Sequence, residues 1–209
     1  MEILLATNNQ KKLKELKAIF KVFDVDLLSF SDFNLSSPEE TGKTFLENAL
    51  IKARAGAAKT GLPTIADDSG LEVEALNGAP GVYSARYAGL DATDEDNYKK
   101  LLKELSRFSQ NERKAQFRCV LAFVRPALDP EPIVSDEIWQ GEIALNPSGK
   151  SGFGYDPVFY VKEHQCTAAE LPSETKNKLS HRAQALKELI KKLEASNLFS
   201  KKIMDEKSG

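Results

Sequence analysis

Cysteine, long apolar runs and a surplus of charge of one sign are all scarce in this sequence. The chain has 209 residues, only two of them cysteines, and its formal net charge is −2 at pH 7. Cys119 and Cys166 are far apart and lack Cys-x-x-Cys spacing, so we expect free thiols in a reducing compartment, most simply the cytoplasm. The nearly neutral charge argues against a general nucleic-acid coat, which needs a basic face.

Apolar runs of transmembrane length are also missing, which predicts no membrane helix. The first residues turn polar at once, unlike a secretory signal peptide, and we find no internal repeat or low-complexity segment. The remaining composition, with 41% hydrophobic and 29% charged residues, is ordinary for a soluble globular protein. We therefore expect one domain of two lobes over residues 1–196, followed by a polar tail over residues 197–209.

Two adjacent carboxylates, Asp67 and Asp68, form the centre of the pattern. The apolar run Pro63–Ala66 predicts the end of a buried strand, and the two acids, Ser69 and Gly70 follow it. Ligands of open α/β sheets collect beyond the carboxyl ends of strands. Two acids in that position are suited to holding a divalent metal or activating a water. The alternative is a solvated turn, because Asp, Ser and Gly all favour turns.

The N-terminal segment predicts a strand, a polar loop and a helix. Glu2–Ala6 is typical of a buried parallel strand, and apolar residues recur at helical spacing from Leu13 to Phe23. The loop Thr7–Lys12 leads into the N-terminus of this helix, where unpaired N–H groups and the dipole favour an anion. Lys12 in the first turn disfavours the helix itself, so a bound anion would explain it. A simple Asn cap followed by surface lysines is the alternative.

Further patterns indicate an α/β chain. Thr44 and Glu47 fit a capping box, which predicts a helix from about Phe45 to Lys59. The alternating segment Leu71–Leu76 is typical of an edge strand or a wall. The other expected elements are a helix after Thr93 and strands at Val25–Phe30, Ala115–Val124, Ile133–Trp139, Gly141–Leu145 and Pro157–Val161.

The segment Gly149–Asp156 is rich in glycine and ends in an aromatic residue and an acid. Its composition alone favours a flexible surface loop. The functional alternative is a loop that lies flat on a planar ligand. Phe153 or Tyr155 would then stack on the ligand, and Asp156 would hydrogen-bond to it.

The last helix begins at Ser180 with two cationic side chains in its first turn, His181 and Arg182. Cations are unfavourable there unless an anionic or electron-rich group lies opposite. Lys176 lies one turn earlier, so three cationic side chains cluster in this segment. They are either surface residues or a binding cluster.

Five segments occur in the order of one known family. They are Thr7–Lys12, Thr44–Ala49, Ala66–Leu71, Phe153–Pro157 and Ser180–Arg182. From Ile3 to about Leu193 the chain resembles the Ham1/inosine triphosphate pyrophosphatase family. The segment Pro80–Tyr87 resembles the bacterial branch of that family in particular.

This resemblance implies an α/β fold with an elongated mixed β-sheet, flanking helices and two lobes around a central substrate cleft. It also implies a homodimer that needs Mg²⁺ and has no nucleic-acid or membrane partner. The implied activity is hydrolysis of dITP, ITP and XTP to the monophosphate and pyrophosphate. Such an activity keeps deaminated purines out of nucleic acid.

The resemblance also implies roles for individual residues. Asp68 matches the proton acceptor, and Glu39 and Asp68 match the metal ligands. The implied substrate contacts are Thr7, Asn8, Asn9, Gln10, Lys11, Lys12, Lys52, Ser69, Phe153, Gly154, Tyr155, Asp156, Lys176, His181 and Arg182. Many relatives have Gly where this chain has Asn8, but Asn tolerates unusual backbone angles, so we expect the loop to form.

Two rival functions are considered beside this one. A nucleotide sensor without hydrolysis would gain little from paired acids that repel a polyanion. A Maf-type pyrophosphatase would take pyrimidine or modified nucleotides, and the pair His181–Arg182 and the loop Phe153–Asp156 favour a purine instead.

Overall fold

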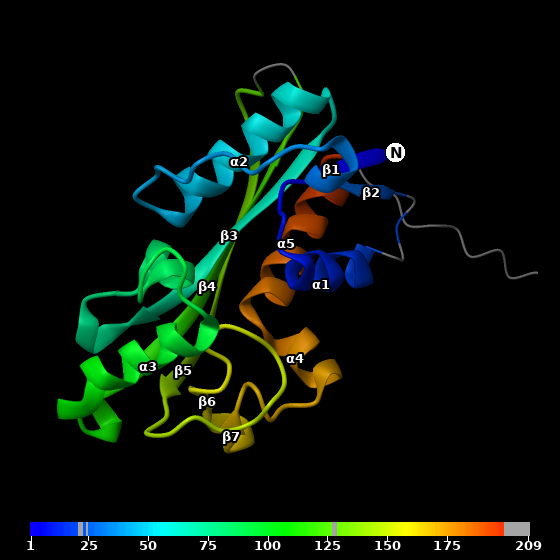
Figure 1. The fold of residues 1–209 in the computed structure, drawn as a ribbon. Helices are drawn as coiled ribbons and strands as arrows, with labels where there is room; N and C mark the ends of the chain where they lie inside the picture. Colours follow the sequence, from blue (N-terminus) through cyan, green and yellow to red (C-terminus); the bar gives the residue numbers. More distant parts are fainter. Residues whose placement is uncertain (21–22, 24, 127–128, 199–209) are drawn as a thin grey trace, which may run out of the picture. The chain divides into compact units, whose positions relative to one another are not determined.

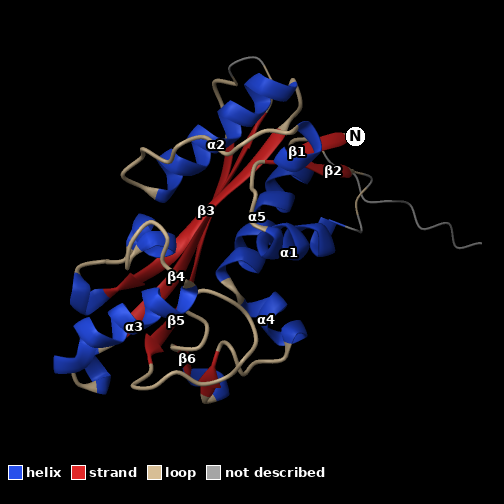
Figure 2. Ribbon diagram, in the orientation of Figure 1, coloured by secondary structure: helices blue, strands red, loops and turns tan. Residues whose placement is uncertain are grey.

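The structure is a computed structural model that describes residues 1–20, 23, 25–126 and 129–198, apart from the side chains of Lys11, Glu15 and Ile19. Its strands form one seven-stranded sheet in the order β2-β1-β3-β4-β5-β6-β7, with helices beside the strands (Figures 1 and 2). This confirms the predicted α/β fold class. The chain divides into two compact units. The first unit comprises Met1–Asp67, Val120–Ser135 and the chain from Leu186, and the second comprises Asp68–Cys119 and Asp136–Ala185.

The first unit is built on parallel strands. β1 (Glu2–Leu5) pairs in parallel with β2 (Asp26–Ser29) and with the start of β3 (Thr64–Val73). Three consecutive side chains of β1 are fully buried, as expected for a parallel strand covered on both faces. Its helices are α1 (Gln10–Phe20) and α2 (Phe45–Thr60).

Helix α2 begins where the sequence predicts it. Thr44 Oγ1 accepts a hydrogen bond from the Glu47 N–H at 3.2 Å, and Glu47 Oε2 accepts one from the Thr44 N–H at 3.2 Å. This capping box satisfies N–H groups that have no partner within the helix. Gly56 has a packing role, because a Cβ there would lie 2.7 Å from Leu4 Cδ2. The glycine therefore allows α2 to pack closely on β1.

The second unit holds one aromatic-rich core. Phe159 of β6 (Phe159–Val161) lies 4.5 Å from Phe117 and 5.1 Å from Trp139 between ring centroids. Leu71 and Leu101 are fully buried in the same cluster. The other elements that carry this unit's residues are β4 (Lys114–Val124), β5 (Ile133–Ile143), β7 (Cys166–Thr167), α3 (Asp94–Glu104), α4 (Ser173–Leu179) and α5 (His181–Ala195), of which β4, β5 and α5 also extend into the first unit.

Short 3₁₀ turns connect these elements. They lie at Phe30–Phe33, Glu74–Leu76, Gly81–Arg86, Leu105–Arg107, Gln110–Glu112 and Lys162–His164. No helix in the described part of the chain is both long and apolar enough to cross a membrane. Of the predicted polar tail, residues 199–209 lie outside the described residues.

The strand prediction around the paired acids is wrong about where the strand ends. β3 does not end at Ala66 but continues through Asp67 and Asp68 to Val73. Of the segment Leu71–Leu76, predicted as an edge strand or a wall, Leu71–Val73 belongs to β3 and Glu74–Leu76 is a 3₁₀ turn. β1 pairs with β3 at Thr64 and Ile65 and does not lie beside this segment. The solvated turn is excluded as well, since both acids are buried. An ion pair at Asp67, described below, offsets the cost of burying that carboxylate.

A second correction concerns β5 and the region near the C-terminus. The sequence predicts a break before Gly141, but Ile133–Ile143 is one strand. A Cβ at Gly141 would lie 2.6 Å from Phe159 Cζ, so this glycine allows β6 to approach rather than forming a turn. Helix α4 is not predicted either, because Pro172 precedes it without a side-chain cap.

Candidate active site

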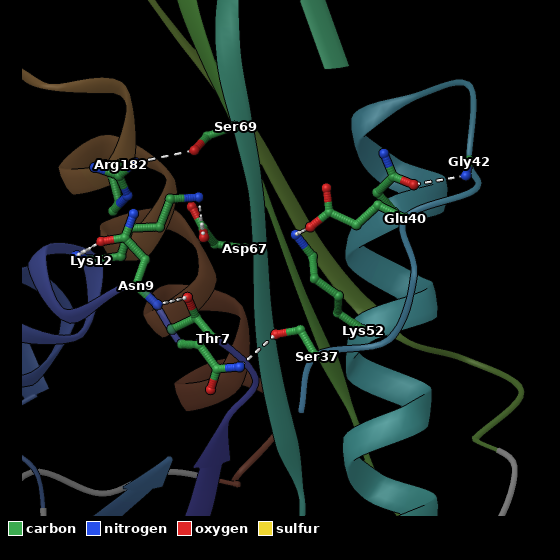
Figure 3. Close-up of polar contacts among 12 residues, drawn as sticks. Thr7, Asn9, Lys12, Ser37, Glu40, Gly42, Lys52, Asp67, Ser69 and Arg182 are labelled. Atoms are coloured by element: carbon green, nitrogen blue, oxygen red, sulfur yellow. Dashed lines mark hydrogen bonds and ion pairs between the residues drawn. The ribbon is translucent and has the colours of Figure 1, made fainter. Parts of the chain in front are cut away.

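The loop between β1 and α1 is fixed by its own side chains. The Asn9 N–H donates to Thr7 Oγ1 at 3.1 Å, and the Lys12 N–H donates to Asn9 Oδ1 at 3.2 Å (Figure 3). Asn9 therefore caps α1, as the sequence allows. Asn8 Nδ2 donates to Ser37 Oγ at 3.3 Å, which ties this loop to the segment that carries Glu39 and Glu40. Gln10 is the first residue of α1, and the side chain of Lys11 lies outside the described residues.

The side chain of Lys12 is directed to an acid of β3. Its Nζ lies 2.7 Å from Asp67 Oδ1, and the Asp67 side chain is only 1% exposed (Figure 3). An isolated buried carboxylate is costly, and the lysine ammonium offsets that cost. Asn9 caps the helix, and Lys12 also has a specific acidic partner in Asp67. From the sequence, a simple Asn cap and a functional loop are alternatives, but in the structure the two features occur together.

A second lysine and carboxylate pair lies elsewhere in the first unit. Lys52 Nζ of α2 lies 2.7 Å from Glu40 Oε1, and the lysine side chain is 6% exposed (Figure 3). The preceding turn of α2 carries Asn48, which is fully buried and accepts the Gly42 N–H at 2.8 Å. Glu39, the predicted metal ligand, is exposed. Helix α2 therefore fixes the acidic segment at two points and binds Glu40 rather than its neighbour.

The strand geometry of β3 separates the two adjacent acids. Successive side chains of a strand point to opposite faces, so Asp67 and Ser69 share one face while Asp68 has the other. Asp68 is buried, with 6% of its surface exposed. Asp67 ends the first unit and Asp68 begins the second.

The cationic residues at the start of α5 each contact a neutral side chain in the second unit. Arg182 Nη2 donates to Ser69 Oγ at 3.1 Å (Figure 3). The His181 ring stacks on Phe117, with 4.7 Å between centroids and 12° between planes. Ser180 Oγ accepts the Ala183 N–H at 3.2 Å and so caps the helix. The side chains of His181 and Arg182 are both buried, so these two residues are not ordinary surface residues.

The glycine-rich loop folds around the ring of Phe153. Lys176 Nζ lies 5.3 Å from the centre of this half-buried ring, and Arg182 Cζ lies 5.6 Å from it. Asp156 Oδ2 accepts hydrogen bonds from the Phe153 N–H at 2.7 Å and from Lys176 Nζ at 2.5 Å. A Cβ at Gly152 would lie 2.1 Å from that oxygen, so only glycine fits. The loop thus presents one aromatic ring beside two cations.

Tyr155 differs from Phe153 in its surroundings. It is buried, and its hydroxyl donates to the Ser84 carbonyl at 2.8 Å. Burial, aided by Tyr87, Asp94 and Glu104, raises the pKa of Tyr155 well above its ordinary value. The hydroxyl therefore stays protonated and anchors the loop. Of the two aromatic candidates, Phe153 has the geometry to stack on a ligand.

A model of the Ham1 family matches residues 3–192, which is almost the whole described chain. The chain belongs to the Ham1 family. Among curated Ham1 relatives, a dITP/XTP pyrophosphatase of Photobacterium profundum is 52% identical over 189 residues, covering 90% of this chain and 96% of the relative. One of Vibrio cholerae is 52% identical over 193 residues, covering 92% of this chain and 96% of the relative.

Solved structures show the same fold. A HAM1 protein from Coxiella burnetii matches with a TM-score of 0.88 at 48% identity, over 93% of this chain and 99% of that one. The Ham1 protein of Staphylococcus aureus matches with a TM-score of 0.83 at 45% identity, over 94% of this chain and 100% of that one. The Ham1 fold therefore extends over both units of the chain.

The resemblance assigns no role to two acids of this Ham1 chain, although the sequence pattern already marks Asp67, together with Asp68, as a candidate for holding a metal or activating a water. Asp67 and Glu40 each stand beside a residue that the resemblance assigns, and each holds a lysine at 2.7 Å. For Asp67, the sequence feature that pointed to a functional role was its position next to Asp68. For Glu40, it was the helical spacing of Asn48 and Lys52, which places both on the face of α2 that binds the acidic segment.

The carboxylates can be tested against the metal that the resemblance implies. Among the residues that the structure describes, no group of three or more His, Cys, Asp or Glu is arranged to hold a metal ion. Mg²⁺ needs no such group, because it binds one or two carboxylates and completes its shell with waters and phosphate oxygens. Glu40 in the first unit and Asp68 in the second are each hard oxygen donors of this kind, so the donor chemistry of each residue suits Mg²⁺.

Proposed function

We propose that this protein hydrolyses deaminated purine nucleoside triphosphates, namely dITP, ITP and XTP, to the monophosphate and pyrophosphate. One observation carries the proposal most directly. The first unit holds two lysines, each at 2.7 Å from a carboxylate. The names of the relatives, dITP/XTP pyrophosphatases at about half identity, support the substrate class.

The two lysine pairs suit a polyphosphate that arrives with a metal. A triphosphate carries about four negative charges near neutral pH, and a nearly neutral protein must supply local cations. We propose that Lys12 and Lys52 exchange their carboxylate partners for phosphate oxygens when the nucleotide binds. Each acid released from a lysine would then remain negative, Asp67 in a buried position and Glu40 in a partly buried one, which favours a cation nearby.

Asp68 and the acidic pair Glu39–Glu40 are the proposed ligands of Mg²⁺. When bound, Mg²⁺ would neutralise phosphate charge and increase the electrophilicity of the phosphorus. Within the pair, Glu40 is the better candidate because it is partly buried and is held by Lys52, whereas Glu39 is exposed.

Proton transfer falls to Asp68 in this proposal. A water attacks the α-phosphorus, Asp68 accepts its proton, and the bond to the β-phosphate oxygen breaks. The leaving pyrophosphate gains negative charge, and the ammonium groups of Lys12 and Lys52 stabilise that charge. The N-terminus of α1 would add the positive end of the helix dipole near the same phosphates, with Asn9 holding the Lys12 N–H in place.

Base selection is assigned to the second unit. A 6-oxo purine offers an acceptor where adenine offers an amino donor, and Arg182 supplies N–H donors. An adenine would leave those donors facing another donor, which is costly in a buried site. Phe153 would stack on the purine, with Lys176 and His181 completing the surroundings. Ser69 orients Arg182 through their hydrogen bond.

We further propose that the protein acts as a homodimer in the cytoplasm, as the resemblance implies. Its substrate is a free nucleotide, so neither a nucleic acid nor a membrane is needed as a partner. Two free cysteines, one buried and one partly buried, are compatible with a reducing compartment.

The test is pyrophosphate release from dITP, XTP, dGTP and dATP, each with and without Mg²⁺. We expect metal-dependent release from dITP and XTP and little from dATP, which lacks the 6-oxo group. We also expect little from dGTP, which shares the 6-oxo group and must therefore be rejected at position 2 of the purine rather than by Arg182. Release from all four would leave the phosphate chemistry intact but contradict base selection by Arg182. Release from pyrimidine nucleotides alone would favour the Maf-type alternative, and binding without release would favour a sensor.

A further inference from the structure

The glycine-rich loop needs external restraint to hold Phe153. Gly149, Gly152 and Gly154 all have positive φ, at 84°, 82° and 62°. Glycine populates such angles freely, but it also leaves the unrestrained backbone with many conformations. Phe153 lies between two of these glycines, so contacts outside the glycines must determine the direction of its ring.

Two carboxylates restrain the peptides on either side of Phe153. On one side, the Phe153 N–H donates to Asp156 Oδ2 at 2.7 Å, a contact within the loop itself. On the other side, the Gly154 N–H donates to Asp94 Oδ2 at 2.9 Å. Asp94 is the first residue of α3 and lies 60 residues earlier in the chain. The loop is therefore fastened to a separate helix at the residue after its aromatic ring.

Asp94 is not required to cap its own helix. The capping box of α3 is made by Thr93 and Asp96, with the Asp96 N–H donating to Thr93 Oγ1 at 3.1 Å and the Thr93 N–H to Asp96 Oδ2 at 2.9 Å. The carboxylate of Asp94 is not part of that capping box, and it accepts the Gly154 N–H.

The start of α3 is a fixed platform for this contact. Asn97, which is 2% exposed, accepts the Ala88 N–H at 2.7 Å and donates to the Ala85 carbonyl at 3.2 Å. These bonds join the first turns of α3 to the segment after β3. The same segment holds Tyr155 through the Ser84 carbonyl. Because α3 and the segment that anchors Tyr155 are held together, loss of the contact between Asp94 and Gly154 should move the loop backbone at Gly154 and leave α3 in place.

We propose that Asp94 is a positioning residue for purine recognition, which acts by fixing the peptide after Phe153. This inference rests on the proposed function, because it assigns the Phe153 ring to the base. The ring lies within 5.6 Å of both Lys176 and Arg182, so a shift of the backbone at Gly154 misaligns the aromatic face against both cations. Asp94 does not touch the base and contributes nothing to the bond that breaks.

The kinetic test compares three variants in pyrophosphate release from dITP. Asp94→Ala removes the acceptor and should raise KM about tenfold, the scale of one base stacking contact, with kcat within about twofold of the wild type. Asp94→Asn keeps an acceptor oxygen and should restore most of the loss. Glu95→Ala is the matched control, because it removes a neighbouring exposed acid of the same helix turn and should behave as the wild type.

A second measurement does not depend on hydrolysis. Hydrogen exchange of the peptide that contains residues 149–156 should be faster in Asp94→Ala than in the wild type and unchanged in Glu95→Ala. Unchanged exchange in Asp94→Ala, or a lower kcat at constant KM, overturns the proposal. If the wild type releases no pyrophosphate, the proposed function fails, and the exchange measurement still decides whether Asp94 holds the loop.

Discussion

The two units use their cations differently. In the first unit, Lys12 and Lys52 each lie 2.7 Å from a carboxylate. In the second unit, Arg182 donates to a hydroxyl, and both Arg182 and Lys176 lie beside the face of an aromatic ring, although Lys176 also lies 2.5 Å from the Asp156 carboxylate. The first arrangement can exchange partners with a charged ligand and its metal, and the second can enclose a flat, uncharged group. We therefore propose phosphate binding for the first unit and base recognition for the second, with the proton acceptor Asp68 at the start of the second unit.

The lysine and carboxylate pairs also differ from ordinary stabilising ion pairs. A buried pair gains little net stability, because desolvation offsets its Coulomb attraction. We therefore propose that the two pairs of the first unit serve the phosphate ligand, whereas a comparable pair in the second unit, Lys176 with Asp156, lies beside the ring of Phe153. The contacts of the second unit, by contrast, are continuous with an aromatic core and contribute to packing.

The largest effect is expected for the acid that begins the second unit. Asp68→Asn removes the proton acceptor and should lower kcat for dITP by about 10³-fold, within the range of a lost general base. The affinity for the nucleotide, measured by calorimetry with ITP, should stay within a few-fold of the wild type. Near-normal turnover would show that Asp68 is not the proton acceptor, and the proposed mechanism would then need another base.

A smaller effect is expected for a cation of the first unit. Lys52→Met keeps the apolar length of the side chain but removes its charge, and it should lower kcat/KM for dITP by about 10²-fold through lost phosphate contacts. Lys59→Met is the matched control, since Lys59 is an exposed lysine in the last turn of the same helix. Equal losses in both variants would indicate an effect of net charge rather than a phosphate contact.

The smallest effect concerns an acid of the first unit that has only a structural role. Arg125 holds Asp129 through hydrogen bonds at 2.7 and 2.9 Å and lowers the pKa of that carboxyl from 3.8 to about 2. Because the folded pKa is lowered, the stabilisation is present above pH 3.8 and is lost as the pH falls toward 2. Asp129→Asn should cost about 1–2 kcal/mol of unfolding free energy at pH 7.

Urea unfolding of the wild type and Asp129→Asn at pH 7 and at pH 3 measures this difference. The gap in unfolding free energy should shrink at the lower pH, while kcat for dITP at pH 7 stays unchanged. A gap that is the same at both pH values would contradict the charge-dependent contact. A loss of activity would contradict the distinction between structural and functional acids in the first unit.

The sequence predicts best where the determinants are local. Thr44 and Glu47 are three residues apart, and the helix they predict differs from the observed α2 by one residue at its end. Thr93 predicts the start of α3 in the same way. A capping box is completed by neighbouring residues, so no distant contact can displace it.

The errors arise where a distant residue decides the structure. A strand that runs through Asp67 and Asp68 contradicts local propensity, and at Asp67 the compensation comes from Lys12, 55 residues away in the chain. Gly141 is interpreted as a break because the approach of Phe159 cannot be seen locally. The partners of Lys52 and Arg182 were likewise beyond local patterns, although the resemblance named both cations as substrate contacts.

One ratio tests most directly whether the first unit binds phosphate and the second recognises the base. It is kcat/KM for dITP divided by kcat/KM for dATP, measured as pyrophosphate release for the wild type, Lys52→Met and Arg182→Met. The account predicts that Lys52→Met lowers both values together and keeps the ratio, whereas Arg182→Met reduces the ratio by about tenfold or more. A ratio that changes in Lys52→Met, or survives in Arg182→Met, would contradict it.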